Sequence, residues 1–333
     1  MFDIILYIIC FVFGAAGAWL IIRIGSRFSL LDIPNHRSSH KGIIAKGGGI
    51  GILAAFIFIS LILKMPIVSW LPASIISLLS LSGDRIEISP KLRLAAQVVA
   101  ALIFNIFSTL NLQFSVTSIL LTIFFTLFIV ATANWYNFMD GINGIAAITG
   151  VCSFGILALF NYIIAGDYRL TVLAVCIAIS CLGFLPYNCP NAKVFMGDVG
   201  SILLGFVFAV FVIMLSKSFL DFVCLSGFLF PFYADEFVTM FVRLKEGENL
   251  LKPHRRHLYQ LLANEMCITH WKVSVGYGIL QLVVGGAILL TRPLGILPVI
   301  FLLSVVFTGF IYLNYIVRMK LTLRNRDSLE ARK

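Results

Sequence analysis

Three aspartates stand out because each interrupts an otherwise apolar stretch. Asp84 follows one apolar run, Asp140 lies in the segment NWYNFMDGING between two more, and Asp198 begins another within NAKVFMGDVGS. An ionisable side chain in or near a bilayer is costly and is by default a candidate for function. Carboxylates beside glycine-rich backbone suit a hard cation such as Mg²⁺ that also binds phosphate oxygens. The three aspartates therefore predict chemistry on phosphate groups.

The segment around Asp140 also supplies amide side chains. Asn134, Asn137 and Asn143 flank the carboxylate. An amide both donates and accepts hydrogen bonds, so it can orient a carboxylate or bind a sugar hydroxyl. A glycine-punctuated break between two helices leaves backbone polar groups free, which is tolerable at depth only where protein or a water-filled cavity satisfies them. We interpret this break as part of a site.

A second group of polar residues lies between the first two apolar runs. It contains Asn35, Arg37, His40 and Lys46 and ends in a triple glycine that includes Gly48. Glycine lets backbone N–H groups approach a ligand closely, and the positive end of a helix that starts there suits phosphate. Glycine is also a common packing residue in membrane helices. Both explanations stay open.

The one long internal loop, residues 235–271, combines acidic and basic groups. Asp235 and Arg243 are separated by multiples of four residues and therefore share one helical face. The segment KPHRRHLYQLL then supplies four cationic or potentially cationic groups: His254, Arg255, Arg256 and His257. Such a group can clamp a diphosphate. A basic loop that only sets membrane orientation would explain the arginines but not the two histidines.

The elements that must position these residues are membrane helices. Apolar residues make up 60% of the 333 and charged residues 12%, which is typical of an integral membrane protein. Runs long enough to cross ~30 Å of hydrocarbon predict about eleven helices, at 4–24, 47–63, 66–82, 94–110, 114–133, 145–164, 170–186, 199–215, 219–234, 272–290 and 294–317. We expect an all-α polytopic protein with a single transmembrane catalytic domain, 1–317, and a basic cytoplasmic tail, 318–333.

Lysine and arginine are unevenly distributed among the connections. With the N-terminus outside, 21 of the 25 fall on the cytoplasmic side, which predicts an N-out, C-in topology. The polar stretches described above share that side, so we expect the working face to be cytoplasmic. The net charge of +10 reflects this bias and an attraction to anionic lipids and substrates. Basic residues divided among membrane loops argue against a nucleic-acid partner.

Carboxylates, a divalent cation and a cationic loop on one face are typical of phosphoryl transfer. No Ser/His/Asp arrangement is evident, and the histidine pair lacks the partners of a zinc site. A protein that is nearly all membrane favours one lipid-borne reactant and one soluble anionic reactant. A secondary transporter with broken helices is the alternative from another class. Carboxylates at one membrane face, and the lack of an inverted repeat, argue against it.

Four motifs, in order over most of the chain, carry a resemblance to a known family. PNHRSSH…KGGG, NFMDGINGIA, KVFMGDVGS and DEFVTMFVRLKEG…HRRHLYQ resemble those of the polyprenyl-phosphate N-acetylhexosamine-1-phosphate transferases, the WecA/MraY-like superfamily of glycosyl transferase family 4. The HRRHLYQ form is similar to the O-antigen-initiating, WbpL-like branch. The alternative within the superfamily is the phospho-N-acetylmuramoyl-pentapeptide transferase of peptidoglycan synthesis.

The resemblance implies an enzyme of the bacterial inner membrane with its active site facing the cytoplasm. It would transfer a sugar 1-phosphate from a UDP-N-acetylhexosamine to undecaprenyl phosphate, release UMP and start surface polysaccharide (O-antigen) synthesis. The donor would be UDP-GlcNAc or a 6-deoxy relative such as UDP-FucNAc or UDP-QuiNAc. Mg²⁺, with Mn²⁺ as a substitute, would be the cofactor, and related enzymes suggest a homodimer.

The resemblance also implies roles for individual residues. Asp198 would bind Mg²⁺, Asp140 would position the metal or the nucleotide, and Asp84 would serve the lipid phosphate. His254 and His257 would contact the diphosphate of the nucleotide sugar.

This chain departs from the family pattern at two positions. Gly83 precedes Asp84 where the family usually has an Asp-Asp pair, and Asn143 stands where it usually has a second Asp. A phosphate monoester, with a second pKa of about 6, is already mostly dianionic at pH 7. A strong base is therefore dispensable, and Asn143 is interpreted as a hydrogen-bonding neighbour.

Overall fold

The computed structural model describes residues 2–34, 39, 42–85, 88–108, 115–249 and 254–330, without the side chains of 84, 85 and 325–330. Three predicted site residues, Asn35, Arg37 and His40, lie outside the described residues. Asp84 is described only by its backbone, near the end of the third helix. The predicted roles of these four side chains stay predictions.

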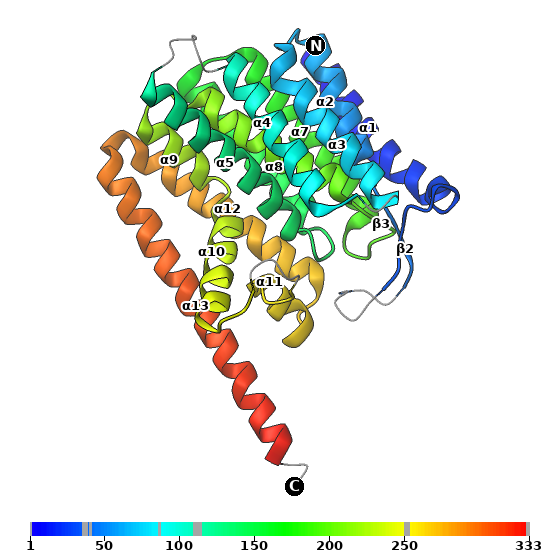
Figure 1. Ribbon diagram of the computed structural model, residues 1–333, viewed down its shortest axis with the longest axis vertical. Helices are drawn as coiled ribbons and strands as arrows, with labels where there is room; N and C mark the ends of the chain where they lie inside the picture. The colour runs from blue at the N-terminus through cyan, green and yellow to red at the C-terminus, as the bar shows by residue number, and fades with distance from the viewer. Residues whose placement is uncertain are drawn as a thin grey trace.

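The chain forms a helical bundle whose elements follow the predicted apolar runs (Figure 1). Its helices are α1 (Phe2–Ile24), α2 (Ile50–Ile62), α3 (Ile67–Arg85), α4 (Pro90–Ser108), α5 (Val116–Phe138), α6 (Ile145–Phe160), α7 (Tyr168–Asn188), α8 (Asp198–Leu215), α9 (Phe219–Gly227), α10 (Phe230–Lys245), α11 (Leu258–Gln260), α12 (His270–Thr291) and α13 (Ile296–Glu330). Short 3₁₀ or π turns extend α1, α6, α11 and α12. The predicted all-α, polytopic class is confirmed.

Within the described residues, eight helices are long and apolar enough to cross a bilayer, or nine if α9 and α10 form one broken span. The apolar helices α2 and α3 are shorter. Each of the eleven predicted runs coincides with one of these helices or with the broken pair. The two termini lie at opposite ends of the bundle (Figure 1), as the predicted N-out, C-in topology requires. Which end faces the cytoplasm stays a prediction.

The run predicted as one span at 219–234 is broken. α9 and α10 meet at an angle of 84°. Pro231 lies in the first turn of α10, where its ring and missing N–H prevent the α9 hydrogen-bond ladder from continuing. Gly227, the last residue of α9, packs so closely that a Cβ there would lie 2.6 Å from Cδ1 of Ile288. The sequence therefore turns the chain inside an apolar run.

The helix α8 lies at the centre of the bundle and packs on α3 and α5. Apart from its two ends, its sequence is apolar or small on every face, and nearly all of its residues are buried. A helix that is hydrophobic all round belongs in a core. Because Asp198 is the first residue of α8, this buried helix brings a carboxylate to one end of the bundle.

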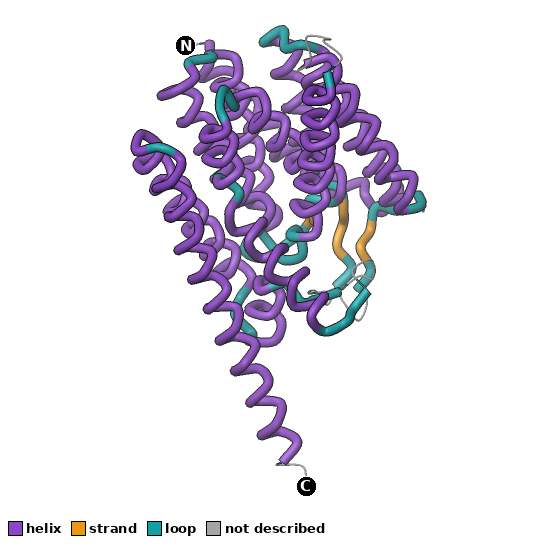
Figure 2. The backbone as a smooth tube through the Cα atoms, turned by 60° about the vertical axis from the view of Figure 1, so that its left-hand side comes forward, coloured by secondary structure: helices purple, strands orange, loops and turns teal. Residues whose placement is uncertain are grey.

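A small sheet lies beside that end, made of β1 (Leu31–Asp32), β2 (Ile44–Lys46) and β3 (Val194–Phe195) (Figure 2). β2 pairs antiparallel with β1 and parallel with β3. The sheet was not predicted, because strands of two or three residues are too short to show an alternating pattern. It places Lys46 opposite Phe195, close to the start of α8.

The predicted boundary after residue 317 does not coincide with a helix end. α13 continues without a break from Ile296 to Glu330, and Figure 1 shows its last turns extending beyond the rest of the molecule. The guanidinium of Arg318 donates a 2.6 Å hydrogen bond to the carbonyl of Arg256. The first turn of the predicted tail therefore belongs to the packed structure.

Candidate active site

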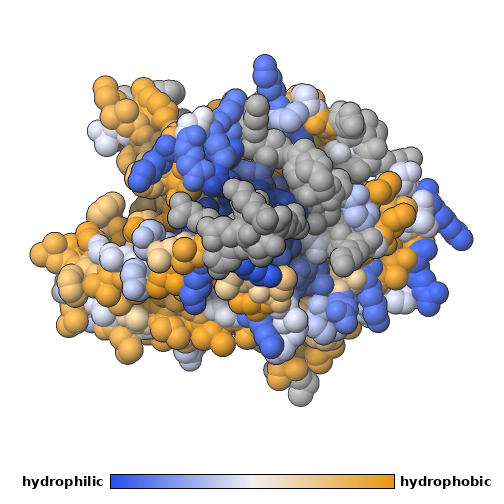
Figure 3. All heavy atoms as spheres, turned by 90° about the horizontal axis from the view of Figure 1, so that it is seen from below, coloured by the Kyte–Doolittle hydropathy of each residue, from blue (hydrophilic) through white to orange (hydrophobic). Residues whose placement is uncertain are grey.

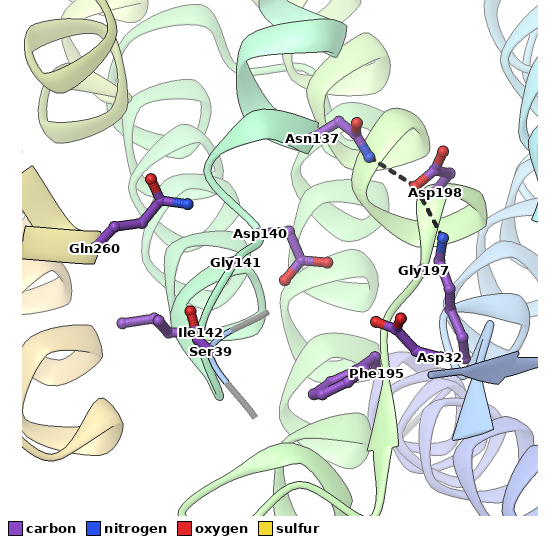
Figure 4. Close-up of a pocket in the computed structure, with 11 residues that line it drawn as sticks. Asp32, Ser39, Asn137, Asp140, Gly141, Ile142, Phe195, Gly197, Asp198 and Gln260 are labelled. Atoms are coloured by element: carbon purple, nitrogen blue, oxygen red, sulfur yellow. Dashed lines mark hydrogen bonds and ion pairs between the residues drawn. The ribbon is translucent and has the colours of Figure 1, made fainter. Parts of the chain in front are cut away.

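Residues from four of the predicted polar segments, those that contain Lys46, Asp140 and Asp198 and the long loop 235–271, line a cavity of about 240 Å³ (Figure 4). The described lining residues are Asp32, Ser39, Lys46, Asn137, Asp140, Gly141, Ile142, Phe195, Gly197, Asp198 and Gln260. Figure 3, viewed from the end of the bundle that carries α11, shows many hydrophilic residues gathered on this face. Segments far apart in the sequence thus form one polar site at the end of an apolar bundle.

Asp198 is held by three side chains that approach it from different elements. A guanidinium nitrogen of Arg93, on α4, donates to Oδ2 in a close ion pair, and Nζ of Lys46 lies 3.7 Å from Oδ1. Asn137 donates to Oδ1 at 3.1 Å and to Oγ of Ser201 at 2.8 Å (Figure 4). Arg93 follows Asp84 in the connection after the third apolar run, so this connection also reaches the edge of the cavity.

Asp140 lines the same cavity but, unlike Asp198, is not held there by other described side chains. Within the described residues its carboxylate has no hydrogen bond or ion pair of its own, and its side chain points into the cavity (Figure 4). Burial, and then the negative charge of Asp198, raise the pKa of Asp140 well above its usual range, against the opposing charge of Lys46. A bound cation would relieve both effects.

The residues around the cavity fit a hard divalent cation. Asp32, Asp140 and Asp198 offer carboxylate oxygens, and among the described residues no histidine or cysteine lines the cavity. Oxygen donors suit Mg²⁺ or Mn²⁺ better than a softer metal. The described residues contain no cluster of three His, Cys, Asp or Glu that could hold a metal alone. An ion here would therefore complete its coordination with water or phosphate oxygens.

The triple glycine serves the fold. The N–H groups of Gly47 and Gly48 donate to the carbonyl of Phe195 at 3.1 and 2.9 Å, and that of Gly49 donates to the carbonyl of Met196 at 2.9 Å. A Cβ on Gly48 would lie 2.8 Å from the ring of Phe184. The expectation that these N–H groups are open to a ligand is wrong, because main-chain carbonyls already bind them. The packing explanation accounts for the glycines.

Asp235 and Arg243 share one face of α10, as predicted, and that face points into the protein, with exposed fractions of 0% and 2%. The carboxylate of Asp235 accepts hydrogen bonds from the N–H groups of Leu258 at 2.7 Å and Tyr259 at 3.2 Å, and from the hydroxyl of Tyr277 at 2.7 Å. Asp235 thus anchors the start of α11 and does not line the cavity.

Two arginines of the long loop, Arg243 and Arg256, are paired with acidic residues of the same loop. Nε of Arg243 donates to Glu248 at 2.9 Å, and its guanidinium also donates to the carbonyl of Asn249 at 2.7 Å. Arg256 forms close ion pairs with Glu246 and Glu248.

The long loop contacts the cavity through a residue other than these arginines. Arg255 lies in the same loop without lining the described cavity. From residues 254–260, the described cavity lining includes Gln260 alone.

The pKa values of the two predicted histidines shift in opposite directions. His257 is 2% exposed, and its Nδ1 lies 3.2 Å from Glu236 and 3.8 Å from Asp235. Burial alone would lower the pKa of His257, but interactions with Asp235 and Glu236 outweigh it and raise the pKa. Burial and the neighbouring cations His257 and Arg243 lower the pKa of His254 to about 4. His254 is therefore neutral near pH 7, and neither ring lines the described cavity.

Two predicted asparagines hold the surrounding helices. Asn134 donates to Oε1 of Gln97 at 2.6 Å, joining α5 to α4. The side-chain amide of Asn143 donates to the carbonyl of Pro190 at 3.1 Å, and the main-chain carbonyl of Asn143 accepts from the hydroxyl of Ser274 at 2.8 Å. An ionised carboxylate could not donate to Pro190, so the amide at 143 fits its surroundings. Asn143 forms hydrogen bonds with these neighbours and does not line the described cavity, so its predicted role in substrate binding stays a prediction.

Sequence reasoning missed Asp32, Arg93 and Gln260 as parts of the site. Arg93 carried a usable signal, because a cation in the first turn of a helix is disfavoured by the helix dipole and needs an anionic partner. Asp32 and Gln260 lie in short elements, where spacing does not tell which way a side chain points.

Comparisons with known proteins place the chain in a family. A model of glycosyl transferase family 4 matches residues 66–216. The chain is 30% identical over 244 residues to an undecaprenyl-phosphate alpha-N-acetylglucosaminyl 1-phosphate transferase of Thermotoga maritima, which covers 73% of this chain and 75% of that protein. A Yersinia pestis protein of the same name is 26% identical over 273 residues, covering 76% of this chain and 74% of that protein.

A second kind of relative matches over a shorter region. A phospho-N-acetylmuramoyl-pentapeptide-transferase of Nitratiruptor is 32% identical over 180 residues, covering 48% of this chain and 50% of that protein. Both kinds of relative align with this chain, and the match to the first extends over about three quarters of each protein. With its polytopic helical bundle and a polar cavity lined by carboxylates at one end of it, this chain belongs to glycosyl transferase family 4.

Proposed function

We propose that this protein transfers an N-acetylhexosamine 1-phosphate from a UDP-sugar to undecaprenyl phosphate and releases UMP. The observation that carries the proposal is the cavity where Asp140 and Asp198 meet Lys46 and Arg93 at the polar end of an apolar bundle. Paired carboxylates with adjacent cations suit two reactants that both carry phosphate. The names of the long-matching relatives support the same reaction.

In the proposed reaction, an oxygen of the lipid phosphate attacks the sugar-bearing phosphorus of the UDP-sugar. A new P–O bond forms there, and the bond from that phosphorus to the bridging oxygen breaks, so UMP leaves with the bonding electrons. The attacking phosphate is mostly dianionic near pH 7, since its second pKa is about 6. The chain's task is to hold two anions together, and Lys46 and Arg93 supply positive charge beside Asp198.

We propose Mg²⁺, with Mn²⁺ as a substitute, as the cofactor held by Asp140 and Asp198. Such an ion would neutralise charge on phosphate oxygens. Asn137 keeps the Asp198 carboxylate oriented through its 3.1 Å hydrogen bond. Asp140, with no partner of its own among the described residues, is the group with most to gain from the ion.

The lipid acceptor is supported by an apolar pocket of about 770 Å³ between α10 and α13. Its walls include Phe237, Phe241 and Phe307, and Lys245 and Arg318 also line it. Phe237 and Phe241 are exposed on the side of the bundle. An apolar wall with cations beside it suits the tail of a polyprenyl phosphate, because the phosphate end is anionic.

The proposed setting is the cytoplasmic face of a bacterial inner membrane, where the product would start O-antigen synthesis. The distribution of Lys and Arg supports the orientation, and the HRRHLYQ segment supports the branch.

The reaction can be tested with membranes that contain the protein, radiolabelled undecaprenyl phosphate and a panel of UDP-sugars. We expect a labelled lipid diphosphate sugar with one of the GlcNAc, GalNAc, FucNAc or QuiNAc donors. Product formation only with UDP-N-acetylmuramoyl-pentapeptide would establish the peptidoglycan alternative instead. No product and no UMP with any donor would overturn the proposal.

A further inference from the structure

Tyr259 connects the basic loop to the turn that carries Asp140. Its side chain is fully buried, and its hydroxyl donates a 2.9 Å hydrogen bond to the carbonyl of Phe138. Phe138 is the last residue of α5 and lies two positions before Asp140. The next residue along the loop, Gln260, lines the cavity. One phenol thus lies beneath the Asp140 turn and beside the cavity wall.

Gly141 shows how closely the phenol meets this turn. A Cβ at position 141 would lie 2.2 Å from the Tyr259 hydroxyl oxygen and 3.1 Å from Cζ. Only glycine allows so close an approach to the hydroxyl. The hydroxyl therefore touches both sides of Asp140, through the carbonyl of Phe138 and the Cα of Gly141.

The other end of this connection is fixed by Asp235. The Tyr259 N–H donates to its carboxylate, as the Leu258 N–H and the Tyr277 hydroxyl also do. Asp235 has no exposed surface, and buried hydrogen-bond networks of this kind are rigid when their members are satisfied. The position of Tyr259 is therefore fixed by α10 and α12, and its hydroxyl in turn fixes the position of the Asp140 turn.

We propose that Tyr259 is a positioning residue for Asp140, so that its hydroxyl fixes the distance between that carboxylate and Asp198 across the cavity. The inference rests on the proposed function. It assigns Tyr259 no contact with substrate. Its action is to hold the Asp140 turn where a cation can reach both carboxylates, and small misplacements of reacting groups cost up to ~100-fold in rate.

Tyr259→Phe tests the inference, because it removes the hydroxyl and keeps the ring. We expect kcat for UMP release to fall about 10-fold or more, KM for the UDP-sugar to change little, and half-maximal activity to need more Mg²⁺. Tyr233→Phe is the matched control, since its hydroxyl joins α10 to Thr132 on α5 at 2.9 Å, away from the cavity. The two variants should lose similar thermal stability, and only Tyr259→Phe should shift the Mg²⁺ requirement.

Gly141→Ala supplies a second test through a double-mutant cycle. Alone, the added methyl group must displace the Asp140 turn, and we expect a loss of at least 10-fold in kcat. Combined with Tyr259→Phe, the nearest clash is gone and 3.1 Å remains to Cζ. The double variant should therefore turn over several-fold faster than Gly141→Ala alone, which no loss of general stability would produce.

The outcomes separate the inference from the proposed function. A wild-type protein that releases no UMP with any donor overturns both. An active wild type with normal kcat and Mg²⁺ requirement in Tyr259→Phe overturns the inference alone. Multiplicative losses in the double variant also overturn it, because they would show that the methyl group and the hydroxyl do not meet.

Discussion

Two carboxylates near opposite ends of the bundle, the half-buried Asp140 and the buried Asp221, differ in how they are satisfied. Asp221, in α9 and far from α11 (Figure 1), accepts hydrogen bonds from Arg292 at 3.0 and 2.6 Å and from the Ser218 hydroxyl at 2.9 Å. Asp140 faces a cavity with no partner among the described residues. A carboxylate such as Asp221, whose oxygens are hydrogen-bonded by other elements, holds those elements together. A carboxylate such as Asp140, which faces a cavity without such bonds, is available to bind a ligand.

Asp198 lies between these two cases. It is paired with Arg93 and Lys46, yet all three line or border the cavity, and the side chains of the two cations are 28% and 30% exposed. Arg93 and Lys46 are therefore accessible enough to form ion pairs with a bound phosphate. The comparison predicts that variants at the cavity affect turnover and that variants at Asp221 affect stability.

The largest effect is expected for Asp198→Asn. Turnover should fall at least ~100-fold, since a lost metal ligand removes several kcal/mol of charge stabilisation. The thermal midpoint should fall less than in Asp221→Asn, because the variant also removes the repulsion between Asp198 and Asp140. UMP release and a melting curve in the same detergent provide the measurement. Near-normal turnover would show that Asp198 holds no essential cation.

Asp140→Asn should reduce turnover at least ~10-fold through the loss of a metal ligand without loss of stability. In the absence of metal, the variant should melt at the same temperature as the wild type or slightly higher, because it removes the repulsion between Asp140 and Asp198. Added Mg²⁺ should stabilise the wild type more than the variant. A clear fall in the melting temperature would mean that Asp140 has a structural partner and would break the comparison.

Asp221→Asn should give the opposite result. The variant leaves Arg292 without its carboxylate, and removing one member of a fully buried ion pair costs about 3–5 kcal/mol. The Arg292 side chain is 24% exposed, so we expect a smaller loss, about 2 kcal/mol. At temperatures below the melting temperature of the variant, turnover per folded molecule should equal that of the wild type. Loss of turnover without loss of stability would contradict the division between the two regions.

The smallest effect concerns pH. The pKa of His257 is raised in the folded protein by Asp235 and Glu236, so its ion pairs stabilise fully below the unfolded pKa of about 6.5 and fade as pH rises through the folded pKa. The difference in melting temperature between wild type and His257→Gln should therefore shrink from about pH 6 to about pH 9.

Asp221→Asn provides the control for this pH effect. Its difference from wild type should stay constant over the same range, because the variant leaves His257 and the carboxylates beside it unchanged. A His257→Gln difference that did not change with pH would contradict the raised pKa of His257.

The sequence predicted the helices well, because runs such as 199–215 must be helical to satisfy their backbone within lipid. It also predicted that polar stretches far apart in the chain share one face. The break after Gly227 was missed because the run stays apolar through it, although Pro231 was a usable signal for a helix start. Helical spacing put Asp235 and Arg243 on one face, but spacing does not tell whether that face points to a cavity or to the core.

The sequence also did not show which residues contact one another in the folded protein. Asp198 pairs with Arg93 across 105 positions of the chain, a contact that depends on how α4 and α8 each pack against α3 and α5. The same holds for Tyr259 and Gly141, whose contact exists only because the long loop folds back under the Asp140 turn. Residue types therefore predicted the chemistry, and tertiary packing decided which copies of those residues take part.

UMP release by the purified protein in detergent, measured side by side for wild type, Asp198→Asn and Asp221→Asn, tests the account most directly. We predict that wild type and Asp221→Asn release UMP only when a UDP-N-acetylhexosamine, undecaprenyl phosphate and Mg²⁺ are all present, and that Asp198→Asn does not. Equal release by Asp198→Asn and wild type would contradict the assignment of the cavity as the active site.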